Sequence, residues 1–203
     1  MIYTVVKNLL KILFRIFLRL RIEGAENIPK DGPLVIACNH LSLLDPPVLG
    51  TAATRKVHFM AKEELFVPVL GDIYRLLGAF PVRRGGADRA AIKHGIDILE
   101  SNQVLAIFPE GTRSKTGHML PLLGGASLLA LKSGCDVVPV YIEGRYKPFR
   151  RMVVHVGKPI EMADLRAGRM NKETCDELTR RMETEFARLS GGKSLPPVEK
   201  TEE

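Results

Sequence analysis

Five short apolar runs, separated by segments with helical patterning, constrain the fold of this chain more than any other feature. Each run has the length and composition of a buried strand, and they cover residues 33–38, 57–61, 104–108, 137–142 and 152–156. Helical patterns occupy residues 47–53, 87–100, 120–133 and 171–189. Strands that alternate with helices form sheets covered by helices on both faces. We therefore expect an α/β fold with a single central sheet, mixed and mostly parallel.

The length and charge of the chain limit its organisation and its partners. A chain of 203 residues forms one domain with a sizeable core. We place this domain at residues 23–189 and expect the polar tail at 190–203 to be disordered. A net charge of +7 favours an acidic partner such as nucleic acid, an anionic membrane or a phosphorylated substrate. Three widely spaced cysteines argue against a disulfide framework or a zinc site and indicate a reducing cytosol.

Residues 1–22 form a segment of their own, rich in apolar residues and free of acidic ones. Its cations are Lys7, Lys11, Arg15, Arg19 and Arg21. The first four recur every four residues, so on a helix they share an arc of about 120°. A charge near the middle of a spanning helix costs about 2.5 to 3.5 kcal/mol. We therefore expect a basic amphipathic helix that lies in the membrane interface, at the cytoplasmic face of the cell membrane. An ordinary helix packed on the core is the alternative.

A histidine and an aspartate follow the first apolar run, in the segment 39–45 (NHLSLLD). Histidine is the usual general base near neutral pH, and a carboxylate fixes its tautomer. Positions five apart on a straight helix point about 140° apart. His40 and Asp45 therefore meet only across a strand end, a turn and a helix start. Asp45, followed by two prolines, is equally typical of a helix N-terminus, so the pair alone leaves both interpretations open.

A second group of functional residue types follows the run at 104–108, where residues 108–114 read FPEGTRS. Gly111 permits a tight turn, and Arg113 can bind a phosphate through two hydrogen bonds. A P-loop is excluded because its glycines are missing. Arg83 and Arg84 follow another short apolar stretch. Since α/β proteins bind ligands beyond the carboxyl ends of their strands, we expect the three arginines to form one anion site.

These segments carry a resemblance to a known family. In chain order, residues 39–45 (NHLSLLD), 78–84 (GAFPVRR), 108–113 (FPEGTR) and 138–140 (VPV) resemble the four motifs of the glycerolipid acyltransferases. The resemblance is greatest to the short bacterial 1-acylglycerol-3-phosphate (lysophosphatidic acid) acyltransferases, and it covers residues from about 20 to 160. Two features depart from the family pattern. Pro81 interrupts the second motif, and one N-terminal helix stands in place of two.

The resemblance implies a function and assigns roles to the matching residues. His40, oriented by Asp45, would take the proton of the acceptor's free hydroxyl, which then attacks an acyl thioester and yields phosphatidic acid. The implied acyl donor is acyl carrier protein or coenzyme A, with no further cofactor and no metal. The acceptor phosphate would bind Arg113 and Arg84, with Lys62; register from Gly78 favours Arg84 over Arg83. The implied substrate-binding set also includes Glu110, which orients its loop or the glycerol, and Asn39, Gly111 and Thr112.

Other interpretations remain open at this level. Within the enzyme class, the alternative acceptors are glycerol-3-phosphate and another lysophospholipid. Cys38 lies two residues before His40, so a Cys–His nucleophile is conceivable. A non-catalytic protein that binds anionic lipid through its N-terminal helix is an alternative of a different class. A nucleic-acid binder fits poorly, because the cations lie in an apolar helix and aromatic stacking residues are scarce.

Overall fold

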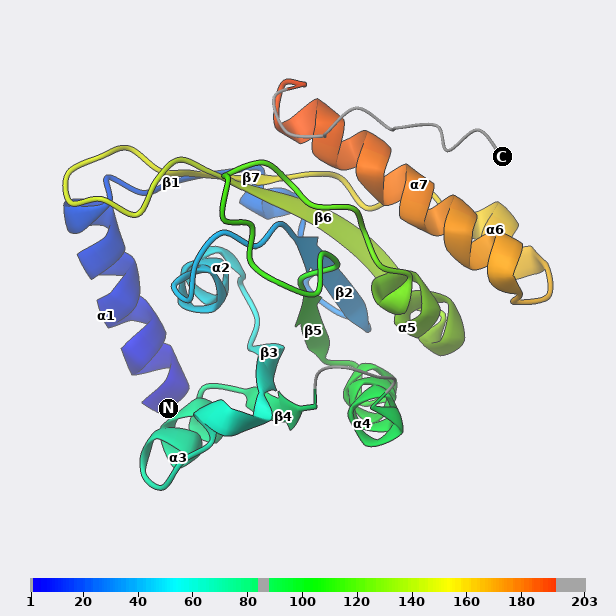
Figure 1. Cartoon of the computed structure of the whole chain (residues 1–203), viewed down its shortest axis with the longest axis horizontal. Helices are drawn as coiled ribbons and strands as arrows, with labels where there is room; N and C mark the ends of the chain where they lie inside the picture. Colours follow the sequence, from blue (N-terminus) through cyan, green and yellow to red (C-terminus); the bar gives the residue numbers. More distant parts are fainter. Residues whose placement is uncertain (1, 84–87, 193–203) are drawn as a thin grey trace.

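The computed structural model describes residues 2–83 and 88–192, and within them one seven-stranded sheet organises the fold (Figure 1). The strand order is β1-β7-β6-β2-β5-β3-β4, and every neighbouring pair is parallel except β6 and β7. The strands are β1 (Arg21–Glu23), β2 (Leu34–Cys38), β3 (Val57–Lys62), β4 (Ala79–Val82), β5 (Val104–Ile107), β6 (Asp136–Glu143) and β7 (Val153–Val156). The predicted mixed, mostly parallel sheet is confirmed.

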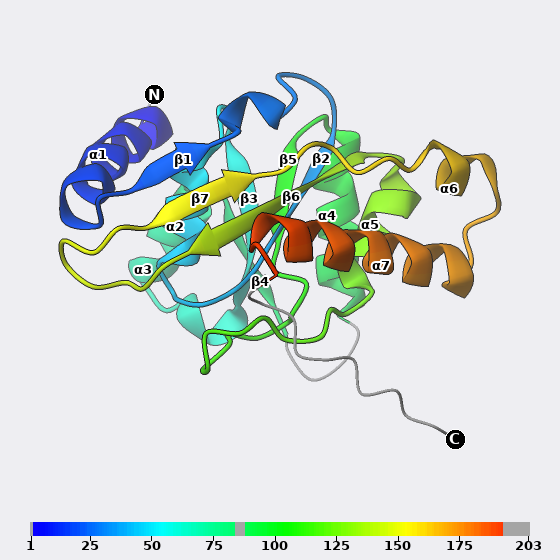
Figure 2. The same cartoon turned by 90° about the horizontal axis from the view of Figure 1, so that it is seen from above.

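Helices cover both faces of this sheet, as the alternating pattern predicts (Figures 1 and 2). One core layer joins the sheet to α4 (Arg89–Glu100), α5 (Gly125–Ser133), α6 (Ala163–Ala167) and α7 (Lys172–Leu189). A second layer, on the opposite face, packs α2 (Asp45–Ala52) and the segment after α1 (Ile2–Phe17) against the strands. The shorter helices are α3 (Leu70–Leu76) and the 3-10 turns Ala25–Asn27 and Glu63–Leu65.

The central strand β2 shows why the apolar runs are unbroken. Val35 and Ala37 face the first core layer, whereas Leu34, Ile36 and Cys38 face the second. All five residues of β2 are fully buried. A strand covered on both faces has no solvent side, so its sequence lacks the polar alternation of a half-exposed strand.

The structure corrects two predicted boundaries. The N-terminal helix ends at Phe17 rather than continuing to residue 22, and residues 21–23 instead form β1, parallel to β7 at the sheet edge. The helix predicted at 120–133 begins only at Gly125. Residues before it are held in another conformation, because the amide nitrogens of Leu120 and Leu123 donate to Glu110 and to the Pro109 carbonyl. Of the tail at 190–203, residues 193–203 lie outside the described part.

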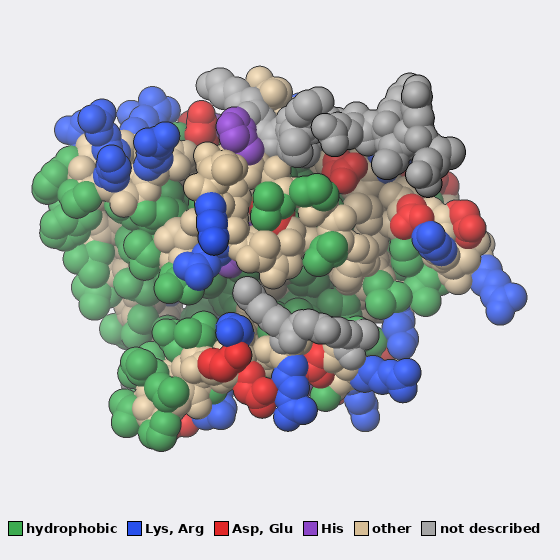
Figure 3. All heavy atoms as spheres, viewed as in Figure 1, with side chains coloured by type: hydrophobic (Ala, Val, Ile, Leu, Met, Phe, Trp, Pro, Cys, Tyr) green, Lys and Arg blue, Asp and Glu red, His purple; other side chains and the backbone are tan. Residues whose placement is uncertain are grey.

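The helix α1 carries its apolar side outward, along the edge of the molecule (Figure 3). Its exposed large apolar residues are Ile2, Val5, Leu9, Ile12, Leu13, Ile16 and Phe17. Lys7 departs from the predicted basic arc: its ammonium group points inward and donates to the Ala53 carbonyl, 3.0 Å away, at the end of α2. Within residues 2–83 and 88–192, no helix combines the length and hydropathy needed to cross a bilayer.

Candidate active site

His40 and Asp45 form a buried hydrogen-bonded pair in the loop between β2 and α2. The distance from His40 Nδ1 to Asp45 Oδ2 is 2.8 Å, and the two residues are 7% and 0% exposed. The chain leaves β2, turns through residues 41–44 and enters α2 at Asp45. This is the strand–turn–helix path that the five-residue spacing requires. It brings together two side chains that a continuous helix would separate.

The Asp45 carboxylate receives four hydrogen bonds. Its Oδ2 accepts from the amide nitrogens of Leu41 and Ser42, both at 2.6 Å, as well as from His40. Its Oδ1 accepts from the Tyr146 hydroxyl at 2.5 Å. Asp45 is the first residue of α2, as its place before two prolines indicated, but its carboxylate bonds back into the turn and makes no capping hydrogen bond. With Asp45 as acceptor, His40 Nδ1 carries the proton and Nε2 is the basic nitrogen.

The His40 ring is fixed in place on two further sides. It stacks on Phe108, with ring centroids 4.1 Å apart and an interplanar angle of 18°. Its amide nitrogen donates to Glu110 Oε1 at 2.7 Å, and its carbonyl accepts from the Ser114 amide at 2.8 Å. Across the described part of the chain, Nε2 forms no hydrogen bond. An imidazole that is held by Asp45, stacked on Phe108 and left with Nε2 available is suited to take a proton from a substrate hydroxyl.

Glu110 joins the two predicted motifs. Its Oε1 binds the His40 amide and its Oε2 binds the Leu120 amide at 2.7 Å, so both carboxylate oxygens are engaged by the backbone. Burial raises the pKa of Glu110, and the two amide donors oppose that shift. Of the two roles that the resemblance allows, the contacts support orientation of the loop. The pairing follows from the sheet, because β2 and β5 are parallel neighbours whose carboxyl ends meet at one edge.

The turn after Glu110 presents Thr112 and Arg113 to solvent. Gly111 has φ +67°, a conformation that favours glycine, and a Cβ there would lie 2.7 Å from Leu123 Cδ1. Both the backbone conformation and the nearby Leu123 side chain therefore require glycine at position 111. Arg113 has no ion-pair partner among the described residues, which leaves its guanidinium available for an anion.

Other residues of the predicted anion site are engaged elsewhere. Arg83 pairs with Glu63 at 3.0 Å and follows β4, two strands from the β5 strand that precedes Arg113, or roughly 10 Å across the sheet. Lys62 pairs with Glu64 at 2.8 Å at the end of β3. In this structure the Arg83 guanidinium is held by Glu63. Arg84, the favoured residue of the second motif, lies outside the described residues.

Asn39 also differs from its predicted substrate-binding role. Its amide nitrogen donates to the Ile142 carbonyl at 3.0 Å, and its amide oxygen accepts from the Ile142 nitrogen at 2.7 Å. The buried side chain thus continues the pairing of β2 with β6 beyond Cys38. Its position fixes the backbone immediately before His40.

Sequence reasoning missed Tyr146 and Phe108. Tyr146 lies in the loop between β6 and β7, 101 positions from Asp45, and no spacing rule connects the two. A single tyrosine in the basic segment 145–151 (RYKPFRR) is the one local signal. Phe108 belongs to the FPEGTR motif but reads as the end of an apolar strand. Its stacking on His40 depends on the adjacency of β2 and β5.

An apolar cavity of about 380 Å³ lies beside the His40–Asp45 turn. It is bounded by α1, α2, α3 and the strands β3 and β4, and Leu43 and Leu44 of the turn contribute to its wall. Its other apolar lining residues include Val6, Leu10, Phe59 and Met60. The volume and lining are typical of a site for an apolar ligand group.

Cys38 is unsuited to act as a nucleophile. It is fully buried, and burial together with the nearby Asp45 and Glu110 carboxylates raises the pKa of its thiol well above the ordinary value. A thiol that stays protonated is a poor nucleophile. In the described residues, no group of three or more His, Cys, Asp or Glu side chains is arranged to hold a metal ion.

Known proteins resemble this chain in sequence and in fold. A family model described as Acyltransferase matches residues 19–143. The 1-acyl-sn-glycerol-3-phosphate acyltransferase of Bacillus subtilis (strain 168) is 32% identical over 169 residues, covering 80% of this chain and 84% of the relative. The Streptococcus pneumoniae protein of that name is 31% identical over 199 residues, covering 93% and 73%. The crystal structure of the 1-acyl-sn-glycerophosphate (LPA) acyltransferase from Thermotoga maritima matches with a TM-score of 0.76 at 28% identity, covering 96% and 80%.

Proposed function

The chain belongs to the acyltransferase family, and on this basis we propose that it acylates 1-acylglycerol-3-phosphate to give phosphatidic acid. The acyl group comes from a thioester of acyl carrier protein or coenzyme A. The observation that carries the proposal is the oriented His40–Asp45 pair, with Nδ1 to Oδ2 at 2.8 Å and Nε2 available. The names and the identity of the relatives over most of the chain support this choice of acceptor.

In the proposed reaction, His40 Nε2 accepts the proton of the acceptor hydroxyl as its oxygen attacks the thioester carbonyl. Asp45 stabilises the imidazolium that forms. Collapse of the tetrahedral intermediate breaks the carbon–sulfur bond, and the thiolate leaves with the proton held by His40. No acyl-enzyme forms. Arg113 binds the acceptor phosphate by charge-assisted hydrogen bonds.

The apolar cavity beside the turn is proposed to hold an acyl chain. Its wall includes Leu43 and Leu44, which lie between the two residues of the catalytic pair. A chain bound there would place its carboxyl end near His40. The lining contributed by α1 also connects this cavity to the proposed membrane surface.

We further propose that the enzyme binds the membrane surface through α1 and α3. The outward apolar side of α1 continues toward Leu70, Ile73 and Leu76 of α3, which are between 45% and 49% exposed (Figure 3). An amphipathic helix of this kind inserts its apolar side among the acyl chains near the headgroups. The placement would give a lipid substrate direct access to the site and puts the enzyme at the cytoplasmic face of the membrane.

The decisive assay measures acyl transfer by the purified protein with both thioester donors. The acceptors are lysophosphatidate, glycerol-3-phosphate and lysophosphatidylcholine. We expect preference for lysophosphatidate and loss of at least about 1,000-fold in kcat for His40→Ala, since general base and orientation act together. The variant should keep its melting temperature within a few degrees. A fully active His40→Ala variant, or a protein that binds vesicles without acyl transfer, would contradict the proposal and support the non-catalytic interpretation.

A further inference from the structure

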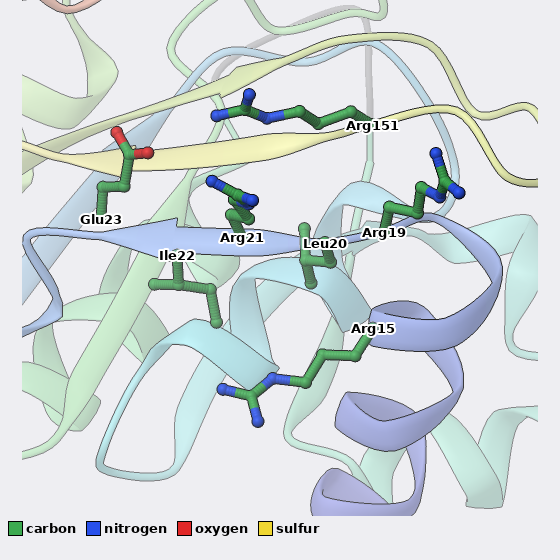
Figure 4. Close-up of a pocket in the computed structure, with 7 residues that line it drawn as sticks. All are labelled: Arg15, Arg19, Leu20, Arg21, Ile22, Glu23 and Arg151. Atoms are coloured by element: carbon green, nitrogen blue, oxygen red, sulfur yellow. The ribbon is translucent and has the colours of Figure 1, made fainter.

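A second basic site lies away from the catalytic loop, at the junction of α1, β1 and β7 (Figure 4). It is a cavity of about 790 Å³ whose charged lining residues are Arg15, Arg19, Arg21, Arg151 and Glu23. Strand β1 is three strands from β2, or roughly 14 Å across the sheet. The cavity is therefore separate from the His40 site and from Arg113.

The strand pairing brings these arginines together. Arg21 lies opposite Val153 in the parallel β1–β7 pair, and its amide nitrogen donates to the Met152 carbonyl. Leu20 and Met152, which directly precede β1 and β7, are buried in the core. Figure 4 shows Arg19, Arg21 and Arg151 on one side of β1, whereas the Arg15 side chain extends from α1 on the other side, toward Ile22.

The charges of this cavity are not balanced within the protein. Across the described residues, none of its four guanidinium groups forms an ion pair or a side-chain hydrogen bond. The one lining carboxylate, Glu23, is engaged by His155 Nδ1 at 3.2 Å. Like charges that line one cavity repel each other and attract an anion. Guanidinium groups favour phosphate because they bind its oxygens in pairs.

The backbone at Arg19 ends α1 in the left-handed conformation that is common at helix C-termini. Arg19 follows α1 with φ +45°, in the left-handed region. Glycine or asparagine is the usual residue there, and other residues cost about 1 to 2 kcal/mol. Here the conformation follows the end of the helix. It turns the chain from α1 into β1 and places the Arg19 side chain at the cavity.

The surroundings of the cavity indicate a lipid. Phe17 and Phe149, 49% and 60% exposed, lie beside each other at the end of α1, with ring centroids 6.0 Å apart. Lysine and arginine side chains gather at this end of α1, next to its column of apolar side chains (Figure 3, upper left). Exposed aromatic residues beside cations are typical of the headgroup level of a membrane.

We propose that this arginine cavity binds the phosphate of an anionic phospholipid headgroup and so orients the enzyme on the membrane. The inference rests on the proposed membrane association of α1. It adds a phosphate site distinct from the one proposed for the acceptor.

The test compares the binding of the full chain to three kinds of vesicle: neutral phosphatidylcholine alone, or with phosphatidylglycerol or phosphatidate. In Arg21→Ala/Arg151→Ala, affinity for both anionic vesicles should fall about 30-fold, since each cation contributes about 1 kcal/mol. Arg169→Ala/Lys172→Ala is the matched control. It removes two exposed cations near α6 and α7, and its affinity should change less than threefold, because salt screens charges more than about 8 Å from the surface.

Three further measurements decide between explanations. Arg21→Lys/Arg151→Lys keeps the charge but not the paired hydrogen bonds, and it should still lose several-fold in affinity. Equal losses in both alanine variants, or wild-type binding by the lysine variant, would show that diffuse charge attraction, and not a phosphate site, accounts for the binding.

Loss of binding to an acidic acyl carrier protein, with vesicle binding intact, would assign the cavity to a protein partner instead. Acyl transfer in neutral detergent micelles should be unchanged in the double alanine variant. If the wild type is inactive in these micelles, the proposed function is refuted, but the proposed headgroup site is not.

Discussion

The Tyr146 hydroxyl donates to Asp45 Oδ1 at 2.5 Å and so links the loop between β6 and β7 to the proposed catalytic pair. The same loop reaches α1, because the Phe149 amide donates to the Phe17 carbonyl and the two rings are adjacent. Burial raises the pKa of Tyr146, and the Asp45 charge raises it further, so the phenol stays protonated and acts as a donor. The loop that contains Tyr146 therefore connects α1 to Asp45.

Replacing Tyr146 by phenylalanine tests that connection. The change leaves Asp45 Oδ1 buried with one donor fewer, and a lost hydrogen bond to a charged group costs about 1.5 to 3 kcal/mol. We expect kcat to fall at least about tenfold, with little change in KM for either substrate, and the melting temperature to fall by several degrees. Steady-state kinetics and thermal unfolding measure both effects. An unchanged kcat in a destabilised protein would limit Tyr146 to a structural role.

Glu110→Gln should destabilise the loop that anchors His40. An amide offers one acceptor where the carboxylate offers two, so either the His40 or the Leu120 amide loses its partner. The expected cost is about 1 to 3 kcal/mol in the free energy of unfolding, with reduced kcat.

The pH dependence of stability gives a separate test of Glu110. Burial raises the pKa of Glu110 in the folded protein above the ordinary 4.5. In the pH window between the ordinary pKa and the raised pKa, the unfolded chain has released this proton and the folded chain still holds it. The free energy of unfolding of the wild type should therefore fall as the pH rises through that window. Denaturant titrations at several pH values should show this contribution in the wild type and not in Glu110→Gln. Identical pH dependence in the two proteins would contradict the assignment.

Arg113→Ala should weaken binding of phosphate-bearing acceptors. The loss of charge-assisted hydrogen bonds worth about 1.5 to 3 kcal/mol raises KM for lysophosphatidate by roughly 10-fold to 150-fold. Arg83→Ala is the matched control, because Arg83 forms an exposed pair with Glu63, and such pairs contribute little. We expect less than a threefold change for the control. A larger increase in KM for Arg83→Ala than for Arg113→Ala would support the sequence-based prediction that Arg83 binds the acceptor phosphate.

Cysteine labelling tests whether Cys38 acts as a nucleophile. Because burial keeps this thiol protonated, iodoacetamide at pH 9 should modify the partly exposed Cys175 and leave Cys38 unmodified in the folded protein. Cys38→Ser should retain acyl transfer, and mass spectrometry of the labelled protein locates the modification. Rapid labelling of Cys38 accompanied by loss of activity would indicate a nucleophilic cysteine.

Local patterns in the sequence determined the class of the fold and the centre of the candidate site. Runs such as 33–38 predicted buried strands because residues covered on both faces are apolar without interruption. The spacing of His40 and Asp45 predicts their contact because both residues belong to one short turn, which is a local structure. The sequence also placed the 108–114 segment just beyond a buried strand, where α/β proteins bind ligands.

Only the tertiary structure decided which charged and polar groups are free to act. Arg83 and Arg113 each follow a strand of the sheet, yet Arg83 pairs with Glu63 while Arg113 has no ion-pair partner among the described residues. Lys7 fits a membrane-facing arc but reaches the end of α2 instead. Tyr146 meets Asp45 across 101 positions. Side-chain partners of this kind depend on packing between distant elements, and no local periodicity encodes that packing.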